Sequence, residues 1–166
     1  NIRKKNLALL ALLGILLAAG WFLSTYAIVE GTLYRKDAVS LDLRGQEISV
    51  SHYEKLKEKL PNAQIAWDVP FQVGILSEDT KELTVTELTA EDARVLAEHL
   101  PMLRRVNAEE CGDYDSLLWL KQQRPGVQVN YRVPLNGQNY ASTAIRVTLS
   151  GISPEDMDRL QYLPLL

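Results

Sequence analysis

A stretch of 23 consecutive uncharged residues near the N-terminus, residues 7–29, places the strongest constraint on this 166-residue chain. At about 1.5 Å per residue, a helix over this stretch would be about 34 Å long, and the hydrocarbon core of a bilayer is about 30 Å thick. Arg3, Lys4 and Lys5 precede the stretch, and basic segments of this kind stay in the cytoplasm. The pattern therefore predicts a transmembrane helix over residues 7–29 after a cytoplasmic basic tail over residues 1–6.

A cleaved signal peptide is the alternative interpretation of the same stretch. The apolar region of a signal peptide is usually only about 7–15 residues long, which favours an uncleaved anchor. Both interpretations place residues 30–166 outside the cytoplasm and differ only in tethering. We expect a single-pass protein of the cell membrane with a cytoplasmic N-terminus, a linker over residues 30–37 and an extracytoplasmic domain over residues 38–166.

The exported part shows signs of internal duplication, because residues 65–103 overlay residues 129–166 at a shift of 64 positions, with one residue deleted near the end. Three dipeptides recur in the same order: Val69-Pro70 and Val133-Pro134, Glu91-Asp92 and Glu155-Asp156, and Leu100-Pro101 and Leu163-Pro164. Matching dipeptides in a fixed order indicate repeated units. Short alternating runs within these units predict strands over residues 39–43, 83–85, 106–108, 127–131 and 147–149.

A helix is expected after most of these strands, because apolar residues recur there at helical spacing. The expected N-caps are Ser51, Thr89, Asp115 and Ser153, and the prolines that end the helices are Pro61, Pro101, Pro125 and Pro164. Strand, helix, strand at this period predicts parallel strands joined by crossovers. The strands alternate between apolar and polar residues, which predicts helices on one face of the sheet only.

The run from Leu103 to Cys111, LRRVNAEEC, resembles the LxxLxLxxN/C segment of leucine-rich repeats. Residues 38–166 resemble the irregular leucine-rich repeats of membrane-anchored, exported Firmicutes proteins. The resemblance implies an α/β fold, a solenoid with parallel strands and helices on one face. The segments 66–80 and 130–144 are too long for plain repeats and suggest hairpins, so a non-solenoid α/β sandwich is the alternative. We expect the repeat domain to be truncated at Leu166.

Catalytic chemistry finds little support in the sequence. Cys111 lies among acidic residues, which would raise the pKa of its thiol and disfavour a nucleophile. The acidic residues of that loop lack the spacing of an EF-hand, so a solvated loop is preferred to a calcium site. His52 and His99 belong to no metal-binding or catalytic motif. We expect no catalytic residue, no metal and no cofactor, and a protein that is not an enzyme.

The polar face of the predicted strands is the candidate ligand-binding surface. Its residues are Asp42, Arg44, Thr84, Thr86, Asn107, Glu109, Gln128, Asn130, Thr148 and Ser150. A face that is merely solvated is the alternative. The aromatic residues of the two long segments, which are Trp67, Phe71, Tyr131 and Tyr140, fit either core packing or binding.

The charge of the exported part narrows the choice of partner. Beyond residue 29 the chain carries 15 basic and 21 acidic residues, a balance of −6 that disfavours nucleic acid. We expect a membrane-anchored, non-catalytic domain that binds a protein or cell-envelope ligand. An accessory or sensor domain of a larger cell-envelope enzyme is the alternative, and the oligomeric state stays open.

Overall fold

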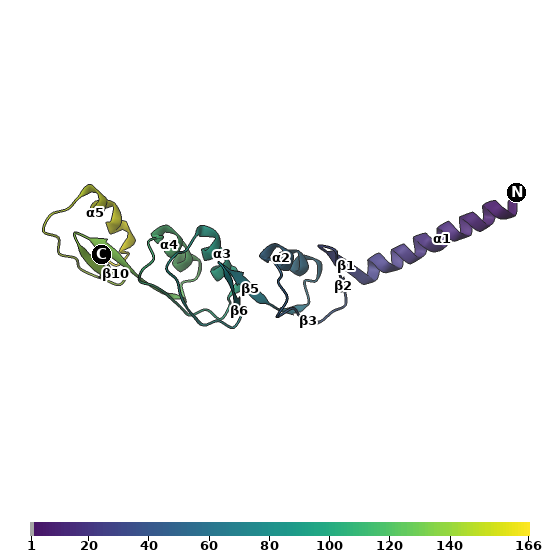
Figure 1. Ribbon diagram of the computed structural model, residues 1–166, viewed down its shortest axis with the longest axis horizontal. Coiled ribbons are helices and arrows are strands. Elements are labelled where there is room, and N and C mark those ends of the chain that lie inside the picture. Colours follow the sequence, from purple (N-terminus) through teal and green to yellow (C-terminus); the bar gives the residue numbers. More distant parts are fainter. Residues whose placement is uncertain (1) are drawn as a thin grey trace. The chain divides into compact units, whose positions relative to one another are not determined.

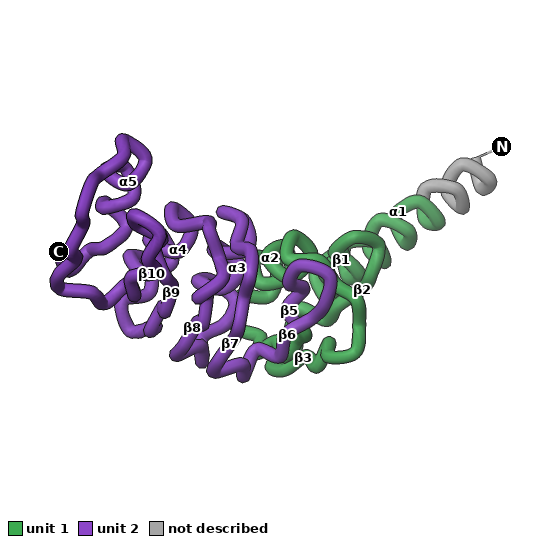
Figure 2. Tube along the Cα trace, turned by 60° about the vertical axis from the view of Figure 1, so that its left-hand side comes forward, with its two compact units in different colours: residues 1–68 green, residues 69–166 purple. Residues whose placement is uncertain are grey.

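The computed structural model describes the backbone of residues 2–166 and the side chains of residues 10–166. The chain divides into two compact units, residues 1–68 and residues 69–166 (Figure 2). Both are mixed α/β structures with short sheets. The side chains of the expected basic tail, residues 1–6, lie outside the described part.

The first unit opens with helix α1 (Ile2–Thr25), which leads directly into a β-hairpin (Figure 1). Strand β1 (Tyr26–Val29) pairs antiparallel with β2 (Thr32–Arg35), which occupies much of the expected linker. The turn residues Glu30 and Gly31 both have positive φ values, 49° and 84°, as a two-residue turn of this hand requires. The Lys36 N–H donates to the Thr25 carbonyl at 2.9 Å, so the hairpin closes against the end of the helix.

This arrangement corrects the prediction of a transmembrane helix over residues 7–29. Within the described part of the chain, no helix combines the length and the apolar character needed to cross a bilayer. The apolar stretch is divided because Ala27 and Val29, only 4% and 3% exposed, are buried in the first unit as parts of a strand. The predicted single-pass membrane localisation with its signal-anchor is therefore wrong as well.

A β-α-β segment completes the first unit. It consists of β3 (Ser40–Asp42), α2 (Val50–Lys59) and β4 (Gln64–Ala66). The two strands are parallel, with Leu41 opposite Ile65. Ser49 caps the helix by accepting the His52 N–H at 3.1 Å, two residues before the predicted cap Ser51.

The second unit is built around a four-stranded sheet in the order β10-β9-β8-β7. The strands are β7 (Glu82–Thr84), β8 (Arg105–Ala108), β9 (Gln128–Leu135) and β10 (Gln138–Ala141). Strands β7, β8 and β9 are parallel, and β10 runs antiparallel to β9. Helix α3 (Ala90–His99) connects β7 to β8, and α4 (Tyr114–Gln123) connects β8 to β9.

Shorter elements surround this sheet. Strand β5 (Asp68–Phe71), which begins at the last residue of the first unit, pairs with β6 (Gly74–Ser77). Helix α5 (Pro154–Arg159) continues into the 3-10 helix η1 (Leu160–Tyr162). The predicted caps Thr89 and Ser153 are confirmed, because each forms a reciprocal capping box with an aspartate three residues later. The helix expected to begin at Asp115 instead has Asp113 at its N-cap position.

The predicted leucine-rich-repeat solenoid is wrong. The described residues form four separate short sheets, and residues 147–149 belong to none of them. Instead, the Tyr140 hydroxyl donates to the Thr148 carbonyl at 3.0 Å, which holds that segment as a loop beside the β9-β10 hairpin. The expected hairpins do form, as β5-β6 and β9-β10. Because the hairpin extends β9 and the strand at 147–149 is missing, the chain does not continue as stacked units.

Candidate functional site

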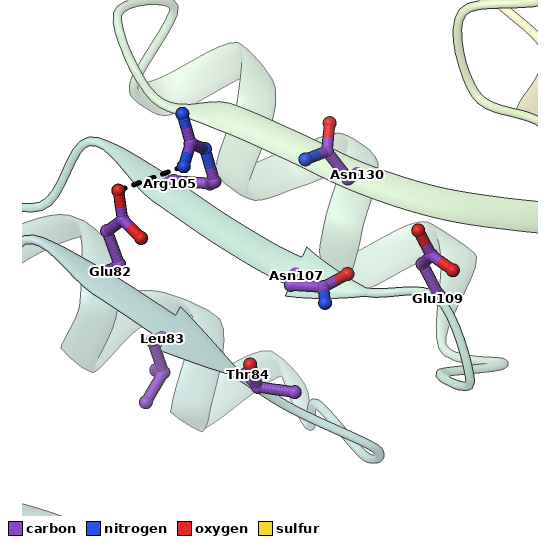
Figure 3. A pocket seen from close by; sticks show the side chains of 7 residues that line it. All are labelled: Glu82, Leu83, Thr84, Arg105, Asn107, Glu109 and Asn130. Atoms are coloured by element: carbon purple, nitrogen blue, oxygen red, sulfur yellow. Dashed lines mark hydrogen bonds and ion pairs between the residues drawn. The ribbon is translucent and has the colours of Figure 1, made fainter.

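The exposed face of the four-stranded sheet carries a shallow groove of about 340 Å³ (Figure 3). Its lining residues come from the three parallel strands and the residue after β8: Glu82, Leu83, Thr84, Arg105, Asn107, Glu109 and Asn130. All but one of them are polar. This groove lies within the second unit and is the candidate site, called the sheet groove below.

Strand register places these side chains in two rows across the sheet. One row is Glu82, Arg105 and Gln128, and the other is Thr84, Asn107 and Asn130. Side chains at alternate positions of a strand share a face, so both rows project from the same side. The ladder of backbone hydrogen bonds thus fixes the spacing between neighbouring polar side chains.

The opposite face of the same strands is core. Val106 and Ala108 of β8 are completely buried, and Val129 and Tyr131 of β9 are 4% and 2% exposed. Burial raises the pKa of the Tyr131 phenol to about 12, and its hydroxyl donates to the Tyr162 carbonyl at 2.7 Å. The alternation therefore separates a rigid apolar side from the polar groove.

Ion pairs order the charged side chains of the groove. Arg105 Nη1 donates to Glu82 Oε1 at 2.9 Å, and its Nε donates to Gln128 Oε1 at 3.4 Å. At the end of the groove, Arg132 Nε donates to Glu109 Oε2 at 3.1 Å. These groups are about half exposed, so water screens the pairs and they contribute little to folding. They hold the long side chains in place at the rim.

Asn107 lies in the middle of the row between Thr84 and Asn130. Its Oδ1 atom is buried from solvent and has no hydrogen-bond partner among the described residues. An unpaired buried acceptor costs roughly 1–3 kcal/mol. A ligand that supplies a donor to this atom would recover that cost.

The groove brings together four of the predicted face residues, which are Thr84, Asn107, Glu109 and Asn130. Gln128 adjoins them through Arg105. Leu83 was missed because it was expected on the apolar side of its strand. Glu82 and Arg105 were also missed, although each stands two residues before a predicted face residue and so has the same parity along its strand. The predicted strands began too late to include them.

The remaining predicted residues lie elsewhere. Asp42 and Arg44 belong to the first unit and form an ion pair at 2.6 Å, which lowers the pKa of Asp42 to about 2. Thr86 follows the end of β7. Thr148 and Ser150 lie in the loop beside the β9-β10 hairpin, where the Ser150 hydroxyl accepts a hydrogen bond from Asn136 Nδ2 at 3.2 Å.

Aromatic residues of the two long segments serve mainly as core. Trp67, Phe71 and Tyr131 are 1%, 7% and 2% exposed, and Trp67 stacks on Tyr53 with ring centroids 4.0 Å apart. The Tyr140 hydroxyl proton is shared between the Thr148 carbonyl and Gln138 Oε1, which is 2.9 Å from the hydroxyl oxygen. None of these rings lines the sheet groove.

Cys111 is buried, and this burial raises the pKa of its thiol above the ordinary value. The thiol donates to Asp113 Oδ2 at 3.5 Å, and the same carboxylate atom accepts the Leu88 N–H at 2.8 Å. Asp113 therefore ties the loop before α3 to the start of α4. A protonated, buried thiol beside a carboxylate is a poor nucleophile.

Comparison with known proteins found no matching family, no matching curated protein and no matching solved structure. The resemblance to leucine-rich repeats therefore stays a prediction from the sequence. What can be said of function depends on the groove itself.

Proposed function

We propose that the sheet groove binds an extended polypeptide segment of a protein partner, without catalysis. Its lining offers amide, hydroxyl, carboxylate and guanidinium groups in two parallel rows. These groups match the alternating donors and acceptors of an extended backbone. The groove contains no cysteine, histidine or serine, and its two carboxylates, Glu82 and Glu109, are each paired with an arginine.

The size of the groove supports a short segment. Neighbouring strands lie about 4.8 Å apart, so three strands span about 10 Å, which is the length of about three extended residues. A groove of about 340 Å³ is at the lower end of the range for small-ligand sites. A segment of about three residues would contact one side chain from each strand.

Composition favours a peptide over a nucleic acid. Residues 69–166 contain fourteen acidic and nine basic residues, a net charge of −5. Phosphate backbones are bound by clustered basic residues, and single-stranded bases stack on aromatic rings. The groove has one arginine, already paired with Glu82, and no aromatic residue.

The observation that carries the proposal is the unpaired Oδ1 atom of Asn107 at the centre of the groove. Rotation of the Asn107 side-chain amide would bring this atom to the groove surface, where a peptide N–H would satisfy it. Thr84 and Asn130 on either side can add further hydrogen bonds to the same segment. The site thus selects a ligand with a donor at its midpoint.

Random 12-residue peptides displayed on phage and selected against the full chain provide the test. Selected peptides should bind the Asn107→Ala variant about 3- to 10-fold more weakly, the value of one net hydrogen bond. Thr148→Ala is the matched control, because Thr148 was predicted to lie on the polar strand face but lies outside the groove. The selected peptides should bind this variant within twofold of their affinity for the parent protein. Peptides that bind Asn107→Ala as tightly as the parent protein would refute the proposal.

A further inference from the structure

A second hollow, of about 470 Å³, lies between α3 and α4 on the helical side of the second unit. The two helices are adjacent along the sheet (Figure 1). Four lining residues come from the first half of α3 and three from α4. The volume lies within the range of about 300–1,000 Å³ that is typical of ligand sites.

Trp119 forms one wall of this hollow. It is 37% exposed, whereas its helix neighbours Leu117 and Leu120 are completely buried. The core side of α4 is therefore complete without the indole, which lines the hollow together with Ala93 of α3. Exposed tryptophan in a recess is characteristic of binding hot spots, and its ring face attracts cations.

Two carboxylates stand at the same hollow, Glu91 of α3 and Asp115 of α4. Neither carboxylate caps its helix: Asp92 closes the capping box of α3, and Asp115 is the second residue of α4 rather than its N-cap. Among the described residues, Glu91 has no hydrogen bond or ion pair. Asp115 accepts a hydrogen bond from Tyr162, which raises the pKa of that phenol.

One basic side chain, Arg94, also lines the hollow. It is engaged by Glu98, four residues later on the same helix, with its Nε 3.2 Å from Glu98 Oε2. Its charge is therefore compensated along α3. The indole face and the Glu91 carboxylate are left to attract a positive group, within a unit whose net charge is −5.

We propose that the α3-α4 hollow binds an arginine side chain of a partner polypeptide. The guanidinium group stacks on the Trp119 ring and pairs with Glu91 and Asp115, because a planar cation satisfies an aromatic face and carboxylates together. This site is separate from the sheet groove, since it is formed by helices rather than strands. The two sites can be tested independently.

The test is a titration of the full chain, labelled with ¹⁵N in its tryptophan indoles, with three probes. They are the peptide acetyl-Gly-Ser-Arg-Ser-Gly-amide, the same peptide with citrulline in place of arginine, and free L-arginine. The indole signal of Trp119, assigned by its loss in Trp119→Phe, should shift with the arginine peptide. The citrulline peptide, which has the same shape without the charge, should bind at least 10-fold more weakly.

Charge-neutral variants then locate the site. Glu91→Gln should lower the affinity for the arginine peptide at least 5-fold. Folding should not be disturbed, because Glu91 has no hydrogen-bond or ion-pair partner in the described part of the chain. Glu110→Gln, which removes the same charge from an exposed residue outside the hollow, should change affinity less than twofold. The indole signals of Trp21 and Trp67 should stay in place.

Three outcomes would overturn the proposal. Equal shifts with the arginine and citrulline peptides would show that charge does not matter. Equal losses of affinity for the arginine peptide in Glu91→Gln and Glu110→Gln would show that binding depends on the net charge of the protein and not on the hollow. Tighter binding of free L-arginine than of the peptide would identify a small-molecule site in place of a polypeptide partner.

Discussion

The β-α-β segments of the two units share a local construction but have different surroundings. In the first unit β3 and β4 flank α2, and in the second β8 and β9 flank α4. Both helices have ten residues, and the seventh residue of each, Leu56 and Leu120, is completely buried. The first segment forms a two-stranded sheet, whereas β7 and β10 extend the second to four strands.

This difference determines where the polar side chains find partners. Asp42, the last residue of β3, pairs with Arg44 in the turn that follows the strand. On β8, Arg105 reaches across to Glu82 of β7 and to Gln128 of β9. A groove therefore requires neighbouring strands, and the β-α-β segment by itself does not produce one.

The largest expected effect tests whether the two segments are equally important for stability. Leu56→Ala and Leu120→Ala should each lower the free energy of unfolding by roughly 2–5 kcal/mol, because each leaves a cavity in a packed core. Guanidinium titration of the full chain measures both losses. The exposed end positions Lys59→Ala and Gln123→Ala should stay within about 0.5 kcal/mol. A loss under about 0.5 kcal/mol at either leucine would show that the two β-α-β segments do not depend equally on their buried leucines.

A smaller effect is expected at a contact that only the first unit contains. The His52 ring is 3.0 Å from the Tyr34 hydroxyl through Nε2 and 3.1 Å from Glu30 Oε2 through Nδ1, and it joins the β1-β2 hairpin to α2. His52→Phe should cost roughly 1–3 kcal/mol, because it leaves the buried Tyr34 hydroxyl unpaired. The third residue of α4, Ser116, has no such contact, and Ser116→Ala should stay within about 0.5 kcal/mol.

The double variant Tyr34→Phe/His52→Phe separates the hydrogen bond from general packing. Removing both partners should cost less than the sum of the two single changes, because no polar group is then left unpaired. Additive losses in denaturant titration would contradict the role assigned to this bond.

The stability of the second unit should depend on pH through the Asp156 carboxylate. The Asn136 N–H and then the Ser153 hydroxyl and N–H bind the Asp156 carboxylate and lower its pKa. A carboxylate with a lowered pKa contributes stability above its unfolded pKa of about 3.9, and this contribution is lost as the pH falls through the folded value. The guanidinium midpoint should therefore drop between pH 7 and pH 3, and Asp156→Asn should make this drop smaller. An undiminished drop would assign the acid sensitivity to other groups.

The smallest effect is expected at the ion pair of the first unit. Asp42 and Arg44 are each more than half exposed, so water screens their attraction. Asp42→Asn should leave the guanidinium midpoint at pH 7 unchanged within error. A clear shift of the guanidinium midpoint in Asp42→Asn would show that this ion pair stabilises the first unit despite its exposure to water.

Local features of the fold were largely predictable. Thr89 and Ser153 were identified as caps because each is a hydroxyl residue directly before acidic residues and an apolar helical pattern, all within a few consecutive positions. The predicted strands at 83–85 and 106–108 correspond to β7 and β8, within one residue at each end. Four of the seven groove-lining residues followed from alternation along the predicted strands, but Glu82 and Arg105 were missed because the strand boundaries were placed too late.

Features that depend on distant contacts were not predictable. The apolar residues after Thr25 fit a helix as well as a strand, and the strand forms because Tyr26–Val29 pairs with Thr32–Arg35 and buries Ala27. Residues 147–149 alternate like a strand, yet they have no strand partner in the described structure. Solenoid and membrane predictions both failed where a local pattern was extended without knowledge of its partner.

The sequence by itself determined where α3 and α5 begin and which side of β8 and β9 is polar, because capping and alternation act over a few neighbouring residues. Only the tertiary structure decided that α1 ends at Thr25, that β7, β8 and β9 align their polar rows, and that Asn107 keeps an unpaired oxygen between them. These features come from pairing and burial between residues that are far apart in the chain, and their free energy depends on the whole set of contacts.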